Sequence, residues 1–598
     1  MEMTWDLDEI YTSIDSESCK TDINKLNDYI TNINRWVDEN LINVIEITLM
    51  NVVSLKLNRF LELNNEYQSI YLRLYNYADL LVSVDGNNAK AMKMLDEIEN
   101  ANAELTKSFV VFTKWLCSIA NLEEVINSSP YLLEHQFYLS EITSKSKYML
   151  NESEEQLIIK MQSTGSRAWQ KLYMKILAST NTSIKIDGEI KRISLGELKN
   201  IAYEKDSTLR KLASKAEKRV CKNVSQTISS CINGISGEAI TLCDIKGYES
   251  ITHKVLTENR MDHETLDAML IAIRKSLPII HKYYEAKGKL LGHQSSCPAY
   301  DIYAPIGNDN GKISYSDSKK IIIESFHVFS QELGDFAKRV FDERWIDAEP
   351  RDGKGNYGLT VDIFPIKESR IMTNYSGNYI DITVLAHEIG HAYHSYCLRD
   401  EELLNTYYPT PIAETASIFC ETILNNELIK RVLQEDKITI LERSISDSVY
   451  YIAEMYGRFL FEVELYKKRK TGILSVNELN GMMKKSMKQV YGDAIDENTI
   501  NSYSWVNNIG FYMAGNEFLN FPYTFGVLFS KGLYAEYLNK GSSFVTEYEK
   551  LLKISSKNNI VTLANYMNIN VHSSDFWTSA LKIIEADINE FIKEVNTL

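Results

Sequence analysis

The sequence predicts a mostly α-helical protein with a small amount of β-sheet. Apolar residues recur at spacings of three and four through most of the chain, as in KAMKMLDEIENANAELTKSFVVFTKWLCSIANLEEV, residues 90–125, which is the period of an amphipathic helix. Nine prolines in 598 residues leave room for long unbroken helices. Strand-like alternation is confined to two stretches, residues 182–195 and 357–382.

The N-terminal third is predicted to be a string of helices. Residues 1 to about 175 show helical periodicity with polar connections, and Asn151 or Ser153 is expected to cap a helix in MLNESEEQLIIKMQSTGSRAWQKLY. Two short alternating runs around Asp187-Gly188 then predict a hairpin. We therefore expect an N-terminal helical domain over residues 1–195 and a second domain over residues 196–598.

The second domain is predicted to carry a small sheet just before a histidine-rich helix. Helices resume at Leu195 and continue to about residue 292, followed by the loop-like CPAYDIYAPIG. The stretch YGLTVDIFPIKESRIMTNYSGNYIDI alternates as strands do, and helical periodicity then dominates to the C-terminus.

Composition excludes several classes of protein. The net charge of -16 argues against a nucleic-acid binder, because phosphate binding needs a basic face. No run of about 18 apolar residues predicts a membrane span. The eight cysteines form no C-x-x-C pair and the first residues have no secretory-signal pattern, so we expect a cytoplasmic protein with reduced thiols. The oligomeric state is not predicted.

The chain has ten histidines, and three of them fall in DITVLAHEIGHAYHSYCL, residues 381–398. Asp381 is the expected N-cap of this helix. At about 100° per residue, His387, His391 and His394 lie on the face opposite to an apolar stripe. That stripe is formed by Ile382, Leu385, Ala386, Ile389, Ala392, Tyr393 and Tyr396.

His387 and His391 form the H-E-x-x-H pattern with Glu388 between them. Imidazoles one helical turn apart can both reach a tetrahedral zinc ion. Glu388 projects from the same turn but off the ligand face. His394 lies two turns from His387, too far for all three to share an ion, and Cys397 is predicted to be a small buried hydrophobe.

A third ligand is expected from PTPIAETASIFCETIL, residues 409–424. Thr410-Pro411 marks a helix start, and Glu414 and Glu421 lie on one face of that helix. Glu414 would complete a His₂Glu site with one position open to water. Glu421 could instead fix an imidazole N–H, and a solvated helix face remains the alternative for both.

Two nearby segments have weaker patterns. GKGNYG, residues 353–358, fits G-x-G-x-x-G but follows a polar stretch and precedes a strand, so it is predicted to be a loop and not a nucleotide site. RIMTNYSG, residues 370–377, is predicted to be a strand whose backbone pairs with an extended peptide, with a buried structural strand as the equal alternative.

These residues carry a resemblance to a known family. MTNYSGNYIDITVLAHEIGHAYHSY followed by PIAETASIFCE resembles the metal-binding core of the oligoendopeptidase F group of zinc metallopeptidases, within the thimet oligopeptidase-like family. TWDLDEIY, EPRDGKGNYG and NFPYTFGVLFSKGLY also resemble family positions.

The resemblance implies a two-lobed helical body around a deep substrate channel, and a cytoplasmic hydrolase that cleaves short unstructured peptides. It further implies one Zn²⁺ per chain with His387, His391 and Glu414 as ligands, and Glu388 as the base that activates the zinc-bound water. The second domain would then be the catalytic domain.

The sequence departs from the family in the loop that donates hydrogen bonds to the reaction's oxyanion. Relatives commonly have histidine and tyrosine where this chain has Gly510 and Leu519, so Tyr523 and Tyr512 are the remaining candidate donors. The departure leaves open a zinc-retaining peptide-binding protein with weak or no peptidase activity. A helical scaffold with an accidental H-E-x-x-H is the third reading.

Overall fold

A computed structural model describes residues 2–42, 49–186, 188–307, 312–432 and 434–597. Most of these residues are helical, and the strands form three small sheets, so the predicted fold class is confirmed. The chain divides into two compact units. Unit 1 comprises Met1–Met149, Asn310–Glu427 and Tyr537–Met567, and unit 2 comprises Leu150–Asp309, Leu428–Glu536 and Asn568–Leu598. Because these segments interleave, the expected sequence boundary at residue 195 stays a prediction.

Among the described residues, no helix combines the length and the apolarity that crossing a bilayer requires.

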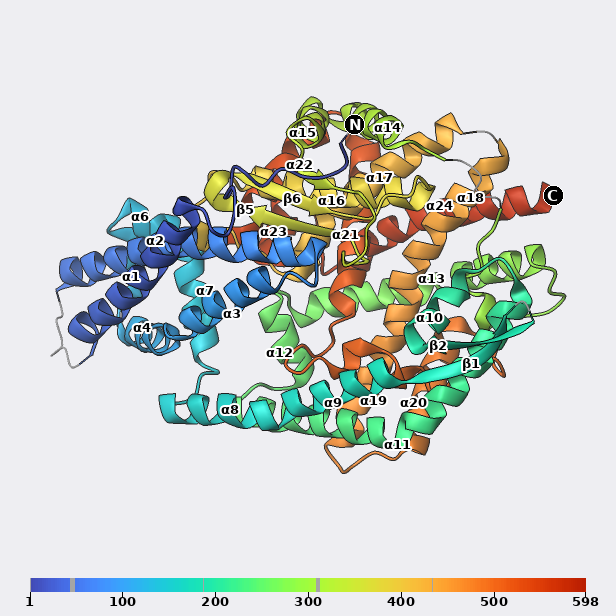
Figure 1. The fold of residues 1–598 in the computed structure, drawn as a ribbon, viewed down its shortest axis with the longest axis horizontal. Coiled ribbons are helices and arrows are strands. Elements are labelled where there is room, and N and C mark those ends of the chain that lie inside the picture. Colours follow the sequence, from blue (N-terminus) through green and yellow to red (C-terminus); the bar gives the residue numbers. More distant parts are fainter. Residues whose placement is uncertain (1, 43–48, 187, 308–311, 433, 598) are drawn as a thin grey trace. The chain divides into compact units, whose positions relative to one another are not determined.

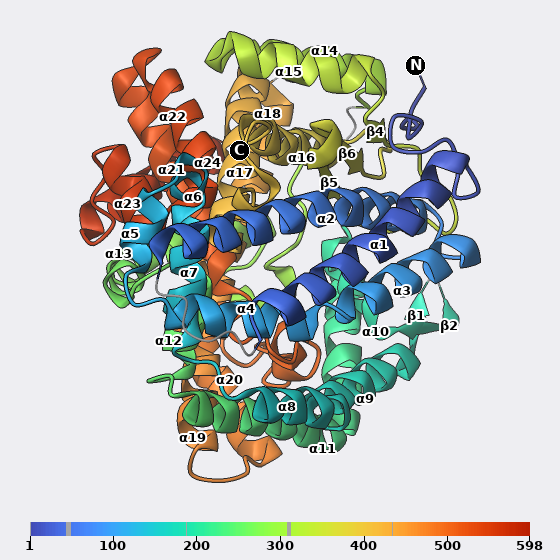
Figure 2. The ribbon, with the colours of Figure 1, turned by 90° about the vertical axis from the view of Figure 1, so that its left-hand side faces the viewer.

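Unit 1 begins with a helical layer in which α1 and α2 lie side by side (Figure 2). Its core is formed by fully buried apolar side chains such as Leu57, Phe60 and Tyr67, and their burial is the main stabilising contribution. The helices of this layer are α1 (Glu17–Asn40), α2 (Met50–Val84), α3 (Ala89–Ala103), α4 (Thr106–Ser118), α5 (Leu122–Asn127), α6 (Pro130–Glu134) and α7 (Gln136–Ser146).

The remainder of unit 1 combines a three-stranded sheet with helices (Figure 1). The strand order is β4-β6-β5, with β6 parallel to β4 and antiparallel to β5. Val361 and Ile363 of β5 join the core of the helical layer. The elements are α14 (Tyr315–Phe329), α15 (Gln331–Asp342), β4 (Ile346–Asp347), β5 (Leu359–Ile363), β6 (Glu368–Met372), α16 (Tyr379–Cys397), α17 (Thr410–Arg431), α22 (Ser543–Ile554) and α23 (Ile560–Tyr566).

Unit 2 is built around the 40-residue helix α11 (Ser207–Lys246), against which α9 packs (Figure 1). The predicted hairpin is present as β1 (Asn181–Ile186) and β2 (Glu189–Ser194), while its turn residue Asp187 lies outside the described residues. The other elements are α8 (Glu152–Thr164), α9 (Ser166–Ser179), α10 (Leu195–Asn200), α12 (Ile251–Glu258), α13 (His263–Leu290), β3 (Cys297–Pro298), α18 (Gln434–Val449), α19 (Met455–Arg469), α20 (Val476–Tyr491), β7 (Ile495–Asp496), α21 (Phe521–Lys540) and α24 (Ser574–Thr597).

Short 3-10 turns and one π turn connect these elements. In chain order they are η1 (Ile201–Tyr203), η2 (Ala299–Asp301), η3 (Phe364–Ile366), η4 (Leu403–Asn405), the π turn η5 (Tyr450–Glu454), η6 (Ser504–Val506), η7 (Ile509–Tyr512) and η8 (Ser555–Lys557).

Two of the helix starts predicted from the sequence agree with the structure, and one does not. Asn151 caps α8 through a capping box with Glu154, as predicted, and α17 begins at Thr410. The expected cap of α16 at Asp381 is wrong by three residues, because Asn378 is the N-cap and accepts from the Asp381 backbone N–H at 2.9 Å. The Asp381 carboxylate instead accepts backbone N–H groups of Ser376 and Gly377 at 2.6 and 2.8 Å. It therefore anchors the chain that enters the histidine helix.

Candidate metal centre

The three predicted ligands lie close together in unit 1. The Nε2 atoms of His387 and His391 on α16 are 3.1 Å apart. Glu414 on α17 places Oε2 3.5 Å from the first and 3.8 Å from the second. Ligands about 2.0–2.1 Å from a tetrahedral zinc ion are about 3.3 Å from each other, so these spacings fit zinc. Each of the three side chains is 15–22 % exposed, so none of them is fully closed off from solvent.

Gly390 lets the two ligand-bearing helices approach closely. A Cβ atom at this position would lie 2.6 Å from the Ser417 Cα and 2.7 Å from the Ala416 carbonyl oxygen on α17. Both contacts are with backbone, so a side chain cannot be accommodated by a rotamer change. The close approach explains how the short Glu414 side chain reaches the two imidazoles.

We expect Gly390→Ala to weaken zinc binding and to destabilise the protein by about 1–3 kcal/mol, because α17 must move away from α16. Gly481→Ala is a matched control, since Gly481 is also helical and its Cβ would meet open space. Thermal unfolding and zinc titration of both variants measure the two effects. A Gly390→Ala protein with wild-type zinc affinity and stability would contradict the close-packing explanation.

Outer contacts orient the imidazoles. His387 Nδ1 hydrogen-bonds the Glu421 carboxylate, which leaves Nε2 pointing to the centre. Burial opposes protonation of His387, but the hydrogen bond to Glu421 and its charge outweigh it and raise the pKa of the imidazole to about 9. Burial lowers the pKa of His391, which also bonds the backbone of Ala413. A carboxylate behind a ligand histidine fixes the tautomer and increases its basicity.

Glu388 lies beside the centre and is only 5 % exposed. The Thr360 hydroxyl on β5 is 2.7 Å from Glu388 Oε2 and 2.9 Å from the Glu388 backbone carbonyl oxygen. Burial raises the pKa of the Glu388 carboxyl, which favours a group able to accept and return a proton.

Thr360 and Gly358 are the site residues that the sequence did not indicate. A Cβ atom on Gly358 would lie 2.3 Å from Glu388 Oε1, so the glycine leaves room for the carboxylate. The strand-like alternation of residues 357–363 predicted a strand near the histidine helix, but nothing in it pointed to Glu388.

Two residues of the histidine helix stay outside the centre. His394 is fully buried, with Nε2 2.7 Å from the Ser555 hydroxyl and its ring stacked on Tyr408. Burial lowers the pKa of His394 to about 3, so the imidazole is neutral. Cys397 is a buried thiol, as predicted.

Part of the segment predicted to pair with a peptide, residues 370–377, has both backbone edges occupied: Ile371 and Met372 pair with β4 and with β5. β6 is the central strand and has β5 on one side and β4 on the other. Beyond β6, the backbone N–H groups of Thr373 and Tyr375 donate to the carbonyls of Asp347 and Ala348, both at 2.9 Å. Residues 370–372 are therefore part of a structural strand, which is the alternative that the sequence left open, whereas pairing of residues 373–377 with a peptide stays a prediction. β5 is an outer strand of this sheet. The neighbouring GKGNYG segment is a loop, as predicted.

The two candidate oxyanion donors lie in unit 2 and differ in environment. Tyr512 is fully buried, stacks on Tyr173 at 3.7 Å, and donates its hydroxyl to the Trp505 carbonyl at 3.0 Å. Tyr523 lies in the first turn of α21, is partly buried, and has its ring 6.4 Å from that of Tyr451. A Cβ on Gly510 would be 3.0 Å from the Asn520 amide nitrogen.

The chain is mostly helical, and two histidines of an H-E-x-x-H motif converge with a glutamate of a second helix. This combination is typical of a metal-dependent peptidase. Comparison with known proteins agrees. The description "Peptidase family M3" matches residues 200–583, and "Oligopeptidase F" matches residues 117–181. The chain therefore belongs to peptidase family M3.

Individual relatives are distant in sequence. The chromosomal oligoendopeptidase F of Lactococcus lactis subsp. cremoris is 28% identical over 354 residues, which cover 59% of this chain and 58% of the relative. Oligopeptidase PepF of Bacillus subtilis (strain 168) is 23% identical over 528 residues, covering 87% and 78%. A solved putative peptidase from Chlamydophila abortus has a TM-score of 0.84 at 20% identity, covering 99% of this chain and 98% of that one. The last comparison shows a shared fold.

Proposed function

We propose that the chain is a zinc-dependent endopeptidase of short oligopeptides. His387, His391 and Glu414 would hold one zinc ion, and Glu388 would act as the general base. The observation that carries the proposal is the convergence of His387 Nε2, His391 Nε2 and Glu414 Oε2 within 4.8 Å of one another, with Glu388 in the same helical turn.

The roles of the residues follow from their surroundings. Zinc, when bound, would polarise the scissile carbonyl and lower the pKa of the attacking water. Glu388 would take the proton from that water and return it to the leaving amine, helped by the burial that raises its pKa. Thr360 holds the carboxylate in place, and Glu421 orients His387.

Peptide size and location are also part of the proposal. The curated relatives are named oligopeptidases or oligoendopeptidases, which supports short peptides as substrates. The net charge of -16 disfavours nucleic-acid partners. All eight cysteines are unpaired, which supports a reducing, cytoplasmic location.

The alternative is a zinc-retaining peptide-binding protein with weak activity, motivated by Gly510 and Leu519. Incubating the protein with a pool of peptides of mixed length, followed by mass spectrometry, separates the two. We expect internal cleavage of short peptides that is lost on chelation and restored by zinc. Intact peptides after prolonged incubation with zinc-loaded protein would favour the alternative.

Tyr523→Phe is expected to lower kcat about 10²- to 10³-fold while KM and zinc content stay near wild type. The reason is that an oxyanion donor forms its hydrogen bond only in the transition state. Tyr512→Phe is the matched control, because the Tyr512 hydroxyl already donates a hydrogen bond to the Trp505 carbonyl. This variant should lower stability more than kcat. Steady-state kinetics of both variants decide. If Tyr523→Phe keeps wild-type kcat while folded and zinc-loaded, another group is the donor.

A further inference from the structure

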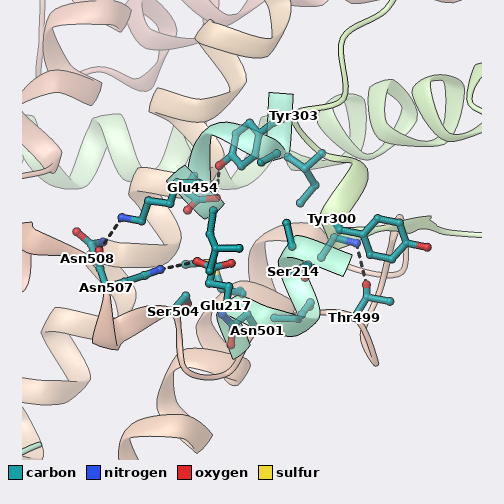
Figure 3. Close-up of a pocket in the computed structure, with 18 of the residues that line it drawn as sticks. Ser214, Glu217, Tyr300, Tyr303, Glu454, Thr499, Asn501, Ser504, Asn507 and Asn508 are labelled. Atoms are coloured by element: carbon teal, nitrogen blue, oxygen red, sulfur yellow. Dashed lines mark hydrogen bonds between the residues drawn. The ribbon is translucent and has the colours of Figure 1, made fainter. Parts of the chain in front are cut away.

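Unit 2 contains a cavity of about 400 Å³ that the proposed peptidase chemistry does not use (Figure 3). Its walls come from α10, α11, η2, α19, α20, the π turn and the loop from Thr499 to Ile509. The volume is in the range of small-molecule sites, about 300–1,000 Å³. Figure 3 shows Glu217, Glu454, Tyr300 and Tyr303 among the side chains that line the cavity.

The charge of one of these carboxylates, Glu454, is balanced by neighbouring side chains. Glu454 accepts hydrogen bonds from the hydroxyls of Tyr303 and Tyr491 at 3.0 and 2.6 Å, and from Arg458 at 2.9 Å. Burial opposes ionisation, but the Arg458 charge and these donors outweigh it and lower the pKa of Glu454. Glu454 and Arg458 therefore form a fixed, charge-neutral part of the wall.

Two other charged side chains at the cavity, Lys199 and Glu217, have no such ion-pair partner among the described residues. Lys199 donates to the Asn507 backbone carbonyl at 2.7 Å, and Glu217 accepts from the Asn507 side-chain amide. Among the described residues, neither Lys199 nor Glu217 has an ion-pair partner within 4.0 Å. One positive and one negative group thus contact the same residue, Asn507, without forming an ion pair within 4.0 Å of each other.

The pKa shifts show that burial outweighs the attraction between the two charges. Burial raises the pKa of Glu217 and lowers the pKa of Lys199, with the other's charge opposing the shift in each case. Both charged forms are therefore disfavoured relative to water, and a ligand that brings opposite charges would relieve both.

A further polar group has no partner inside the protein. The Asn501 amide nitrogen is buried and makes no hydrogen bond with the described residues. Buried donors are almost always satisfied by protein, water or ligand. The lining also includes Met483, Met487, Ile302 and Tyr300, whose apolar surfaces suit an apolar side chain.

The backbone is unusual at this cavity. Tyr450 and Glu454 are the two ends of the π turn Tyr450–Glu454, and both line the cavity. π turns are rare and occur frequently at functional sites, so this irregularity is an observation independent of the charges.

We propose that this cavity binds a small zwitterion, a free amino acid or a dipeptide with an apolar side chain. The ligand's ammonium group would pair with Glu217, and its carboxylate with Lys199 and the Asn501 amide. The apolar side chain would lie against the methionines. Binding needs neither zinc nor peptide hydrolysis, so this proposal does not rest on the proposed function.

The test is calorimetric binding of L-phenylalanine, which no peptidase can cleave, to the full-length zinc-loaded protein. Glycyl-phenylalanine tests the dipeptide. N-acetylphenylalanine removes the ammonium charge, and phenylalanine amide removes the carboxylate. We expect saturable binding of L-phenylalanine or the dipeptide, and a loss of about 10- to 100-fold for each capped analogue, the range for a charged hydrogen bond.

Matched variants connect each ligand group to its residue. Glu217→Gln keeps an acceptor for Asn507 but removes the charge, and Lys199→Met removes the ammonium group while keeping most of the length of the side chain. Each should weaken L-phenylalanine binding by about 10- to 100-fold. Glu249→Gln and Lys191→Met, at exposed positions of the same unit, should leave it unchanged. Thermal unfolding verifies that all four variants are folded.

The decisive outcome is the coupling between ligand and variant. In the Glu217→Gln protein, N-acetylation of phenylalanine should reduce affinity little further, because the partner charge of the ammonium group is already absent. In the Lys199→Met protein, amidation of the carboxylate should likewise reduce affinity little further. Three results would overturn the proposal. The first is that neither L-phenylalanine nor the dipeptide binds. The second is that Glu217→Gln and Lys199→Met leave binding unchanged. The third is that phenylalanine amide binds as tightly as L-phenylalanine.

Discussion

Glu388→Gln should keep zinc bound while lowering kcat by about 10²- to 10⁴-fold, the usual contribution of a general base. The amide has nearly the same shape and can still bond Thr360, so the ligands should not move. It cannot accept the proton of the attacking water. KM should change little, because the lost interaction belongs to the transition state.

Measuring zinc content beside kcat makes this result interpretable. Glu402→Gln is a suitable control, since Glu402 is an exposed glutamate of the same unit, past the end of α16, and the variant should behave as wild type. If zinc-loaded Glu388→Gln turns over peptides at the wild-type rate, Glu388 is not the base and the mechanism is wrong.

Glu414→Ala should lose zinc more severely than any other change on α17. Only two imidazoles would remain, whereas the geometry provides three donors 3.1–3.8 Å apart. Losing an outer-shell partner already costs about 10- to 100-fold in metal affinity, so loss of a direct ligand should exceed about 100-fold.

Glu421→Gln supplies the matched comparison on the same helix, seven residues further along. It removes the charge that faces His387 Nδ1 but no direct ligand, so the expected loss is about 10- to 100-fold. Competition titration with a chelator ranks the two variants. The reverse order, with Glu421→Gln losing more zinc than Glu414→Ala, would make Glu421 the third ligand.

Site residues that lie close together in the sequence, on one face of a helix, could be predicted from their spacing. The i, i+4 pair His387 and His391 must share a helical face, and Glu414 with Glu421 must share another. The structure brings these four together, and the mostly helical fold with its small sheet followed from periodicity alone. The prediction that Cys397 is a buried hydrophobe also agrees with the structure.

Properties that depend on distant neighbours were not predictable. A helical wheel placed His394 on the histidine face but could not show that Tyr408 and Ser555 bury it. Alternation identified a strand at β6 but could not distinguish a central strand from an outer one. Thr360 and Gly358 act on Glu388 across 28 and 30 positions of sequence, and no local pattern carries that information.

X-ray diffraction at the zinc absorption edge, on crystals of the full-length protein grown with zinc, tests the central claim most directly. The account predicts one anomalous peak per chain, bound by His387 Nε2, His391 Nε2 and Glu414 at about 2.0–2.2 Å. Zinc bound elsewhere, or a peak that lacks Glu414 as a ligand, would contradict it.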